Sequence, residues 1–72
     1  LMLVKVETSA QSRSEIIEIA ELFRTKIIDV QQGTMTIEAS GSGDKLEALL
    51  NLLTPYGIKE LVRTGRIGMA RG

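Results

Sequence analysis

The spacing of apolar residues constrains the fold of this chain more than any other feature, because it switches repeatedly between two periods. Alternation of apolar and polar residues indicates a β-strand, whereas apolar residues three and four positions apart indicate an amphipathic helix. Residues 1–8 alternate, with Met2, Val4 and Val6 on one side. We therefore predict a first strand that turns this side to the core.

Two helices are predicted from the segments with the three-and-four spacing. The first ends near Thr25 and begins at Ser12, where Ser12 and Glu15 have the spacing of a capping box. The second begins at Asp44, a common helix-capping residue type, with Glu47 three positions later. Each helix has one apolar face to bury. The two faces consist of Ile16, Ile17, Ile19, Ala20 and Phe23, and of Leu46, Leu49, Leu50 and Leu53.

Two strands are predicted between the helices and one strand after them. Residues 26–31 and 34–40 surround Gly33, for which we expect the positive φ of a tight hairpin turn. Pro55 and Gly57 stop the second helix, and residues 58–64 form the last strand.

This order predicts an α+β fold of the ferredoxin-like βαββαβ type, as a single domain covering residues 1–72. Four strands would form an antiparallel sheet with both helices on one face. The other face is then uncovered, and it would carry Leu1, Leu3 and either Ile27 or Ile28. An exposed sheet face with such residues is a common place for a second domain or a second protomer to pack.

The composition excludes several kinds of site. The chain contains no cysteine and no histidine, so it has no disulfide, no thiolate metal site and no imidazole base. Its nine basic and nine acidic residues cancel, so no attraction of the whole domain to nucleic acid or to an anionic membrane is expected. No apolar run approaches the roughly 20 residues that span a bilayer. Because a domain this small is marginally stable alone, we expect it to associate with another chain.

Three short motifs carry possible ligand chemistry, and each has a simpler interpretation. Glu15, Glu18 and Glu21 share one side of the first helix, where they form either a cation site or, as we prefer, a solvated face. GSGDK at residues 41–45 lacks the spacing of a phosphate-binding loop, so we interpret it as a glycine turn. Residues 8–12 lack the glycine that lets a ligand approach the backbone closely. We therefore predict no catalytic, cofactor-binding or metal-binding residue.

Three arginines, Arg63, Arg66 and Arg71, lie close together near the end of the sequence. They could bind phosphates, but RNA-binding domains of this fold need aromatic residues on the central strands. The two aromatic residues of this chain are predicted in a helix and a loop. Arginine is also enriched at protein interfaces, because its planar head forms paired hydrogen bonds. We therefore interpret these arginines as contacts to a protein partner.

The segment PYGIKELVRTGRIGMARG at residues 55–72 resembles the C-terminal signature of the small, regulatory subunit of acetolactate synthase (acetohydroxyacid synthase). LMLVKV at the start and FRTKIIDV at residues 23–30 resemble other parts of the C-terminal, ACT-like domain of that subunit. The resemblance implies that this chain is the C-terminal part of a longer regulatory subunit, in which an N-terminal ACT domain precedes it.

The resemblance also implies a noncatalytic, cytoplasmic protein with no cofactor of its own. Such a subunit binds and activates a thiamine-diphosphate-dependent catalytic subunit, and it is expected to form a homodimer. It takes part in feedback inhibition by valine in the synthesis of the branched-chain amino acids, valine and isoleucine among them. The family's valine site lies in the N-terminal domains and uses a glycine-containing loop, which has no counterpart in TSAQSRS at residues 8–14. We therefore place no valine ligand on this chain.

We predict Arg63, Arg66 and Ile67 as the residues that contact the catalytic (large) subunit. The alternative function is that of a free-standing amino-acid sensor, which binds its ligand at a homodimer interface. A small hydrolase resembling acylphosphatase would need an asparagine beside a phosphate loop. The one asparagine, Asn51, is predicted in the middle of the second helix, so we reject the hydrolase.

Overall fold

The computed structural model describes residues 1–63. These residues form four strands, two α-helices and one short 3₁₀-helix, in the predicted βαββαβ order. The elements are β1 (Met2–Glu7), α1 (Arg13–Leu22), β2 (Lys26–Val30), β3 (Thr34–Ala39), α2 (Gly43–Leu53), the 3₁₀-helix η1 (Thr54–Tyr56) and β4 (Ile58–Arg63). The predicted α+β fold is confirmed.

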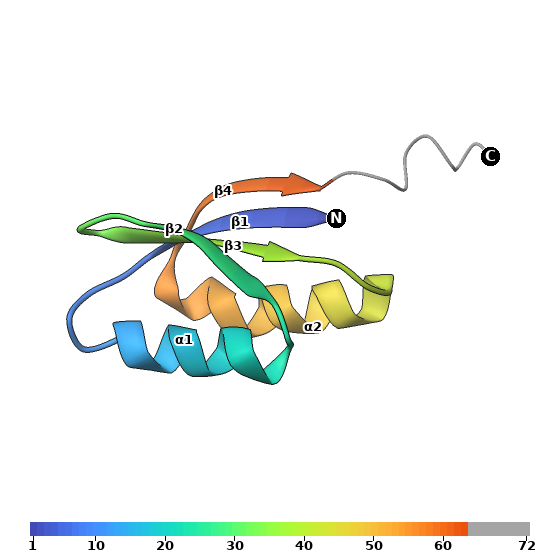
Figure 1. Cartoon of the computed structure of the whole chain (residues 1–72), viewed down its shortest axis with the longest axis horizontal. Coiled ribbons are helices and arrows are strands. Elements are labelled where there is room, and N and C mark those ends of the chain that lie inside the picture. The colour runs from blue at the N-terminus through green and yellow to red at the C-terminus, as the bar shows by residue number, and fades with distance from the viewer. Residues whose placement is uncertain (64–72) are drawn as a thin grey trace.

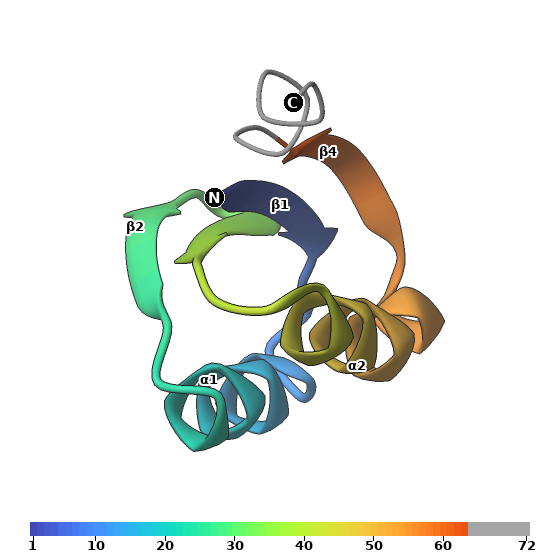
Figure 2. The ribbon, with the colours of Figure 1, turned by 90° about the vertical axis from the view of Figure 1, so that its right-hand side faces the viewer.

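The four strands form one sheet in the order β2-β3-β1-β4, and every neighbouring pair is antiparallel. Both helices cover the same face of this sheet, as Figure 1 shows from the side. Figure 2, along the strands, shows the sheet curving around the helix layer. The outer strands are therefore β2 and β4, and no helix among residues 1–63 lies over the opposite face of the sheet.

The core lies between the sheet and the two helices. The register of β1 against β3 places every second residue of both strands on the helix side, where these residues are buried. One face of each helix completes the core, as predicted from the spacing of apolar residues. The buried residues are Met2, Val4, Val6, Ile16, Ala20, Met35, Ile37, Ala39, Leu46, Leu49 and Leu53.

The start of α1 differs from the prediction. The expected capping box of Ser12 with Glu15 is wrong, because the backbone at Ser12 is already helical (φ −87°, ψ −13°) and its side chain caps no helix N–H. Reciprocal bonds form one turn earlier instead. The Ser9 hydroxyl oxygen accepts from the Ser12 N–H at 3.1 Å, and the Ser12 hydroxyl oxygen accepts from the Ser9 N–H at 2.9 Å. This pair gives partners to the backbone N–H groups of Ser9 and Ser12 in the turn that leads into the helix.

The start of α2 also lies earlier than expected. Ser42, in an extended conformation (φ −69°, ψ 160°), caps the helix by accepting a hydrogen bond from the Lys45 N–H at 3.2 Å. The prediction of Asp44 as the cap is wrong, since Asp44 lies inside the first turn. A carboxylate at that place still stabilises the helix through the positive end of its dipole.

The two glycines Gly33 and Gly57 differ in backbone conformation, and only Gly33 departs from the prediction. The predicted positive φ at Gly33 is wrong, because the turn closes through the Gln31 N–H to the Thr34 oxygen at 2.9 Å without a left-handed residue. The Gly33 carbonyl instead accepts from the Thr8 N–H at 2.9 Å. Gly57 ends the helical segment, as predicted, and it does so with a positive φ of 106°.

A matched pair of glycine substitutions tests this difference. A Cβ at Gly57 would lie 2.8 Å from Glu7 Oε1 and would adopt a strained φ, so Gly57→Ala should lower the free energy of unfolding by about 1–3 kcal/mol. A Cβ at Gly33 meets nothing within 4 Å, so Gly33→Ala should change it by less than about 1 kcal/mol. Urea denaturation followed by circular dichroism measures both variants. Equal losses of stability in the two would contradict this interpretation.

Candidate functional site

The acidic side of α1 does not gather into a single site. Glu15 accepts a hydrogen bond from the Tyr56 hydroxyl at 2.8 Å, so the Glu15 side chain points toward η1. Glu18 and Glu21 lie beside a shallow hollow together with Leu22, whose side chain is 78% exposed. Within residues 1–63, no group of three or more acidic side chains is placed to hold a metal ion. These glutamates form a solvated helix face, from which only Glu15 makes a hydrogen bond to another element among those described.

The hydrogen bond between Tyr56 and Glu15 has an electrostatic consequence. It raises the pKa of the Tyr56 phenol above the ordinary value of 10.0, because ionisation would remove the donated proton. Desolvation and the negative charge of Glu15 act in the same direction. The bond therefore stabilises the fold below the ordinary pKa, and this contribution is lost as the pH rises through the raised pKa.

The loop between β1 and α1 uses its own backbone donors. The N–H groups of Thr8, Ser9 and Ser12 donate to Gly33, to the Ser12 hydroxyl and to the Ser9 hydroxyl, respectively. A hollow of about 520 Å³ lies beside the loop and extends to Pro55. These three amides are not available to a ligand carboxylate unless the loop rearranges.

Of the predicted partner-contact residues, Arg63 lies in the described part of the chain and Arg66 and Ile67 lie outside it. Arg63 ends β4, and its Nη1 donates to Glu47 Oε2 of α2 at 2.9 Å. The Arg63 side chain is 34% exposed, so it is partly occupied by this contact and partly accessible. It therefore joins the sheet to the helix layer and still reaches the surface.

Among residues 1–63, no other element covers the face of the sheet that lies opposite the helices. We call it the open sheet face and define it by six residues that line a hollow of about 230 Å³: Leu3, Lys5, Asp29, Thr36, Glu60 and Val62. The sequence left open whether Ile27 or Ile28 would belong to this side. Ile27 packs against the core, whereas Ile28 is half exposed and lies at a register shift of β2. Leu1, at the start of β1, is also half exposed.

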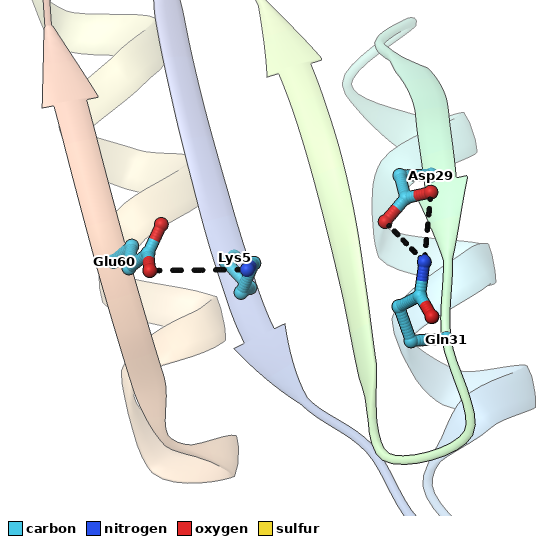
Figure 3. A network of polar contacts seen from close by, with 4 residues as sticks. All are labelled: Lys5, Asp29, Gln31 and Glu60. Atoms are coloured by element: carbon cyan, nitrogen blue, oxygen red, sulfur yellow. Dashed lines mark hydrogen bonds and ion pairs between the residues drawn. The ribbon is translucent and has the colours of Figure 1, made fainter.

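Two polar contacts are arranged on the open sheet face, with β3 between them (Figure 3). On one side, Lys5 Nζ of β1 lies 3.8 Å from Glu60 Oε2 of β4. On the other side, Gln31 Nε2 donates to both carboxylate oxygens of Asp29, at 3.2 and 3.0 Å. The face therefore combines apolar and charged groups, as protein interfaces do.

The fold and its surface define a small ferredoxin-like α+β domain with a one-sided helix layer and an exposed sheet. Neither helix among residues 1–63 is long and apolar enough to cross a membrane. The chain belongs to the family described as the small subunit of acetolactate synthase, whose sequence model matches residues 1–72. The family resemblance noted in the sequence is thereby confirmed.

Individual relatives agree with this assignment. The chain is 49% identical to the acetolactate synthase small subunit of Mycolicibacterium smegmatis, over 100% of this chain and 42% of that protein. It is also 49% identical to the Aquifex aeolicus small subunit, over 99% of this chain and 38% of that protein. The crystal structure of the Thermotoga maritima small subunit superposes with a TM-score of 0.82 at 41% identity, covering 89% of this chain and 39% of that one. The chain thus spans about two fifths of the length of these relatives.

Sequence reasoning missed three of the polar contacts. The pairing of Asp29 with Gln31 could have been found, because residues two apart on a strand share a face. The pairing of Ser9 with Ser12 has the spacing of a capping box, but Ser12 with Glu15 matched the usual pattern better. The contact between Tyr56 and Glu15 joins residues 41 positions apart, and no local pattern predicts it.

The Tyr56 contact can be tested by titration, because Tyr56 is the one tyrosine of the chain and tryptophan is absent. The absorbance of tyrosinate should give a phenol pKa above 10.0, and Glu15→Ala should return it toward that value. Glu18→Ala, on the same helix, serves as the control and should leave the titration unchanged. Identical curves for the unaltered chain and the Glu15→Ala variant would contradict the contact.

Proposed function

We propose that this chain is a noncatalytic regulatory domain that binds and activates the catalytic subunit of acetolactate synthase. The observation that carries the proposal is the family match over all 72 residues, together with relatives named as small subunits of that enzyme. The described surface supports it, since it offers an exposed sheet face. The free-standing amino-acid sensor receives no comparable support.

The domain would act by holding the catalytic subunit in its active form. An effector bound elsewhere in the regulatory subunit would change the free energy of that contact, which is what allosteric coupling means. We place valine in a preceding N-terminal domain, and we assign thiamine diphosphate to the catalytic subunit. We further propose that the regulatory subunit forms a homodimer in the cytoplasm and takes part in feedback control of valine and isoleucine synthesis.

Arg63, Arg66 and Ile67 are the residues we propose for contact with the catalytic subunit. The geometry of Arg63 supports this role. Its Nη1 donates to Glu47, and because a guanidinium has five N–H donors, others remain for a partner. The Glu47 contact fixes the direction of the side chain, and the remaining donors can pair with a carboxylate or carbonyl of the partner.

Replacing Arg63, Arg66 and Ile67 together by alanine should weaken binding to the catalytic subunit by at least about tenfold, because arginine contacts are frequent hot spots. Biolayer interferometry measures the affinity, and acetolactate formation by the catalytic subunit measures activation. Glu47→Gln is the control for Arg63, because it weakens the internal contact and keeps the guanidinium. Unchanged affinity and activation in the triple variant would reject this assignment of contact residues.

The placement of the effector site outside this chain has its own test. Isothermal titration calorimetry of the chain with valine, leucine and isoleucine should give no binding heat at micromolar ligand, because the amides of Thr8, Ser9 and Ser12 are internally bonded. The same ligands are also titrated into the Ser9→Ala variant. Binding heat that appears only in this variant would show that the hydrogen bonds between Ser9 and Ser12 exclude the ligand. Micromolar binding by the unaltered chain would favour the sensor function.

A further inference from the structure

The open sheet face carries one uncompensated negative charge. Among its six residues, two are carboxylates, Asp29 and Glu60, and one is a cation, Lys5. Lys5 is paired with Glu60, whereas Asp29 receives the neutral amide of Gln31. No basic side chain among residues 1–63 forms an ion pair with Asp29. The charge of this face is therefore complementary to a cation supplied by another molecule.

The Asp29 carboxylate is held in place before any partner arrives. The Gln31 amide nitrogen lies within hydrogen-bond distance of both its oxygens, which restricts rotation of the carboxylate. Figure 3 shows the pair on the same side of the sheet as Lys5, away from the helices. A side chain that is already ordered loses less conformational entropy when it binds. The arrangement favours recognition of a positively charged group.

Apolar contacts lie within reach of the same carboxylate. Leu3 and Val62 are directly opposite each other on β1 and β4, and Val62 is 51% exposed. Neighbouring strands are about 4.8 Å apart, so β1 and β2 are separated by about 10 Å across β3. Alternate residues of an extended chain are about 7 Å apart. One apolar and one basic side chain of an extended segment can therefore cover Leu3 with Val62 and reach Asp29 together.

We propose that the open sheet face binds an extended segment of the catalytic subunit that carries an arginine or a lysine. The cation pairs with Asp29, its aliphatic stem crosses Thr36, and a neighbouring apolar side chain packs on Leu3 and Val62. This proposal rests on the proposed function, since it names a surface through which the domain would hold the catalytic subunit.

A second copy of this chain is a poorer occupant. Two open sheet faces packed together would contribute twice two carboxylates and twice one ammonium group. Glu38 and Lys26 lie on the same side of the sheet and cancel each other in charge, so negative charge remains on both sides of the contact. Like charges brought together at an interface are unfavourable and act against the wrong partner. A basic segment neutralises the excess negative charge, whereas a second copy of the chain doubles it.

The test measures affinity for the catalytic subunit by biolayer interferometry at low and at physiological salt. Asp29→Lys should weaken binding by at least about tenfold, and Asp29→Asn by about threefold. The difference in affinity between each variant and the unaltered chain should be smaller at physiological salt than at low salt. Glu18→Lys is the matched control, because it makes the same change of charge on α1 and should alter affinity by less than about twofold. Circular dichroism checks that the variants remain folded.

The outcomes separate this proposal from the proposed function. If the unaltered chain does not bind the catalytic subunit, the proposed function fails, and this proposal fails with it. If the unaltered chain binds and Asp29→Lys binds equally well, the open sheet face is not the docking surface, although the function stands. If Asp29→Lys changes the oligomeric state in analytical ultracentrifugation with unchanged affinity for the catalytic subunit, the occupant is a second copy, and the proposal is overturned.

Discussion

The pairing of β1 with β3 at the centre of the sheet is the contact on which the rest of this structure depends. Their antiparallel register brings the alternating apolar residues of both strands to one side, where the two helices cover them together with Ile27 of β2 and Ile58 of β4. Because the side-chain period of a strand is two, a slip of one residue would turn all of these side chains to solvent. The central pair therefore fixes which face is core and which is open.

A helix layer on one face leaves the other face and both outer strands to be completed from outside. Half-exposed apolar residues lie on these strands, Ile28 and Val30 on β2, and Leu61 and Val62 on β4. A domain of this length buries little apolar surface in its own core. Further burial through association therefore contributes a large share of its total stability. A regulatory subunit that works through contact has a physical use for such surfaces, since a change in contact energy can be passed to the partner.

Several polar groups at the ends of the elements are hydrogen-bonded to one another. Ser9 and Ser12 satisfy each other, Thr8 donates to Gly33, and Tyr56 reaches Glu15 from the far end of the chain. These bonds hold the loop beside β1 in one conformation. Ligand recognition by a loop requires free backbone donors, and the N–H groups of Thr8, Ser9 and Ser12 are already bonded within the chain. Regulation through protein contact fits this arrangement better than direct binding of an amino acid.

The sequence by itself determined the order of elements, the fold and the core faces, because hydrophobic periods of two and of three to four are local properties. It also indicated the family, through a segment whose last residues lie outside the described structure. Only the tertiary structure decided the backbone of Gly33 and the choice between Ile27 and Ile28. Each of these depends on where a distant carbonyl or a neighbouring strand lies. The uncompensated charge of Asp29 has the same origin, since its environment is set by which strands lie beside β2.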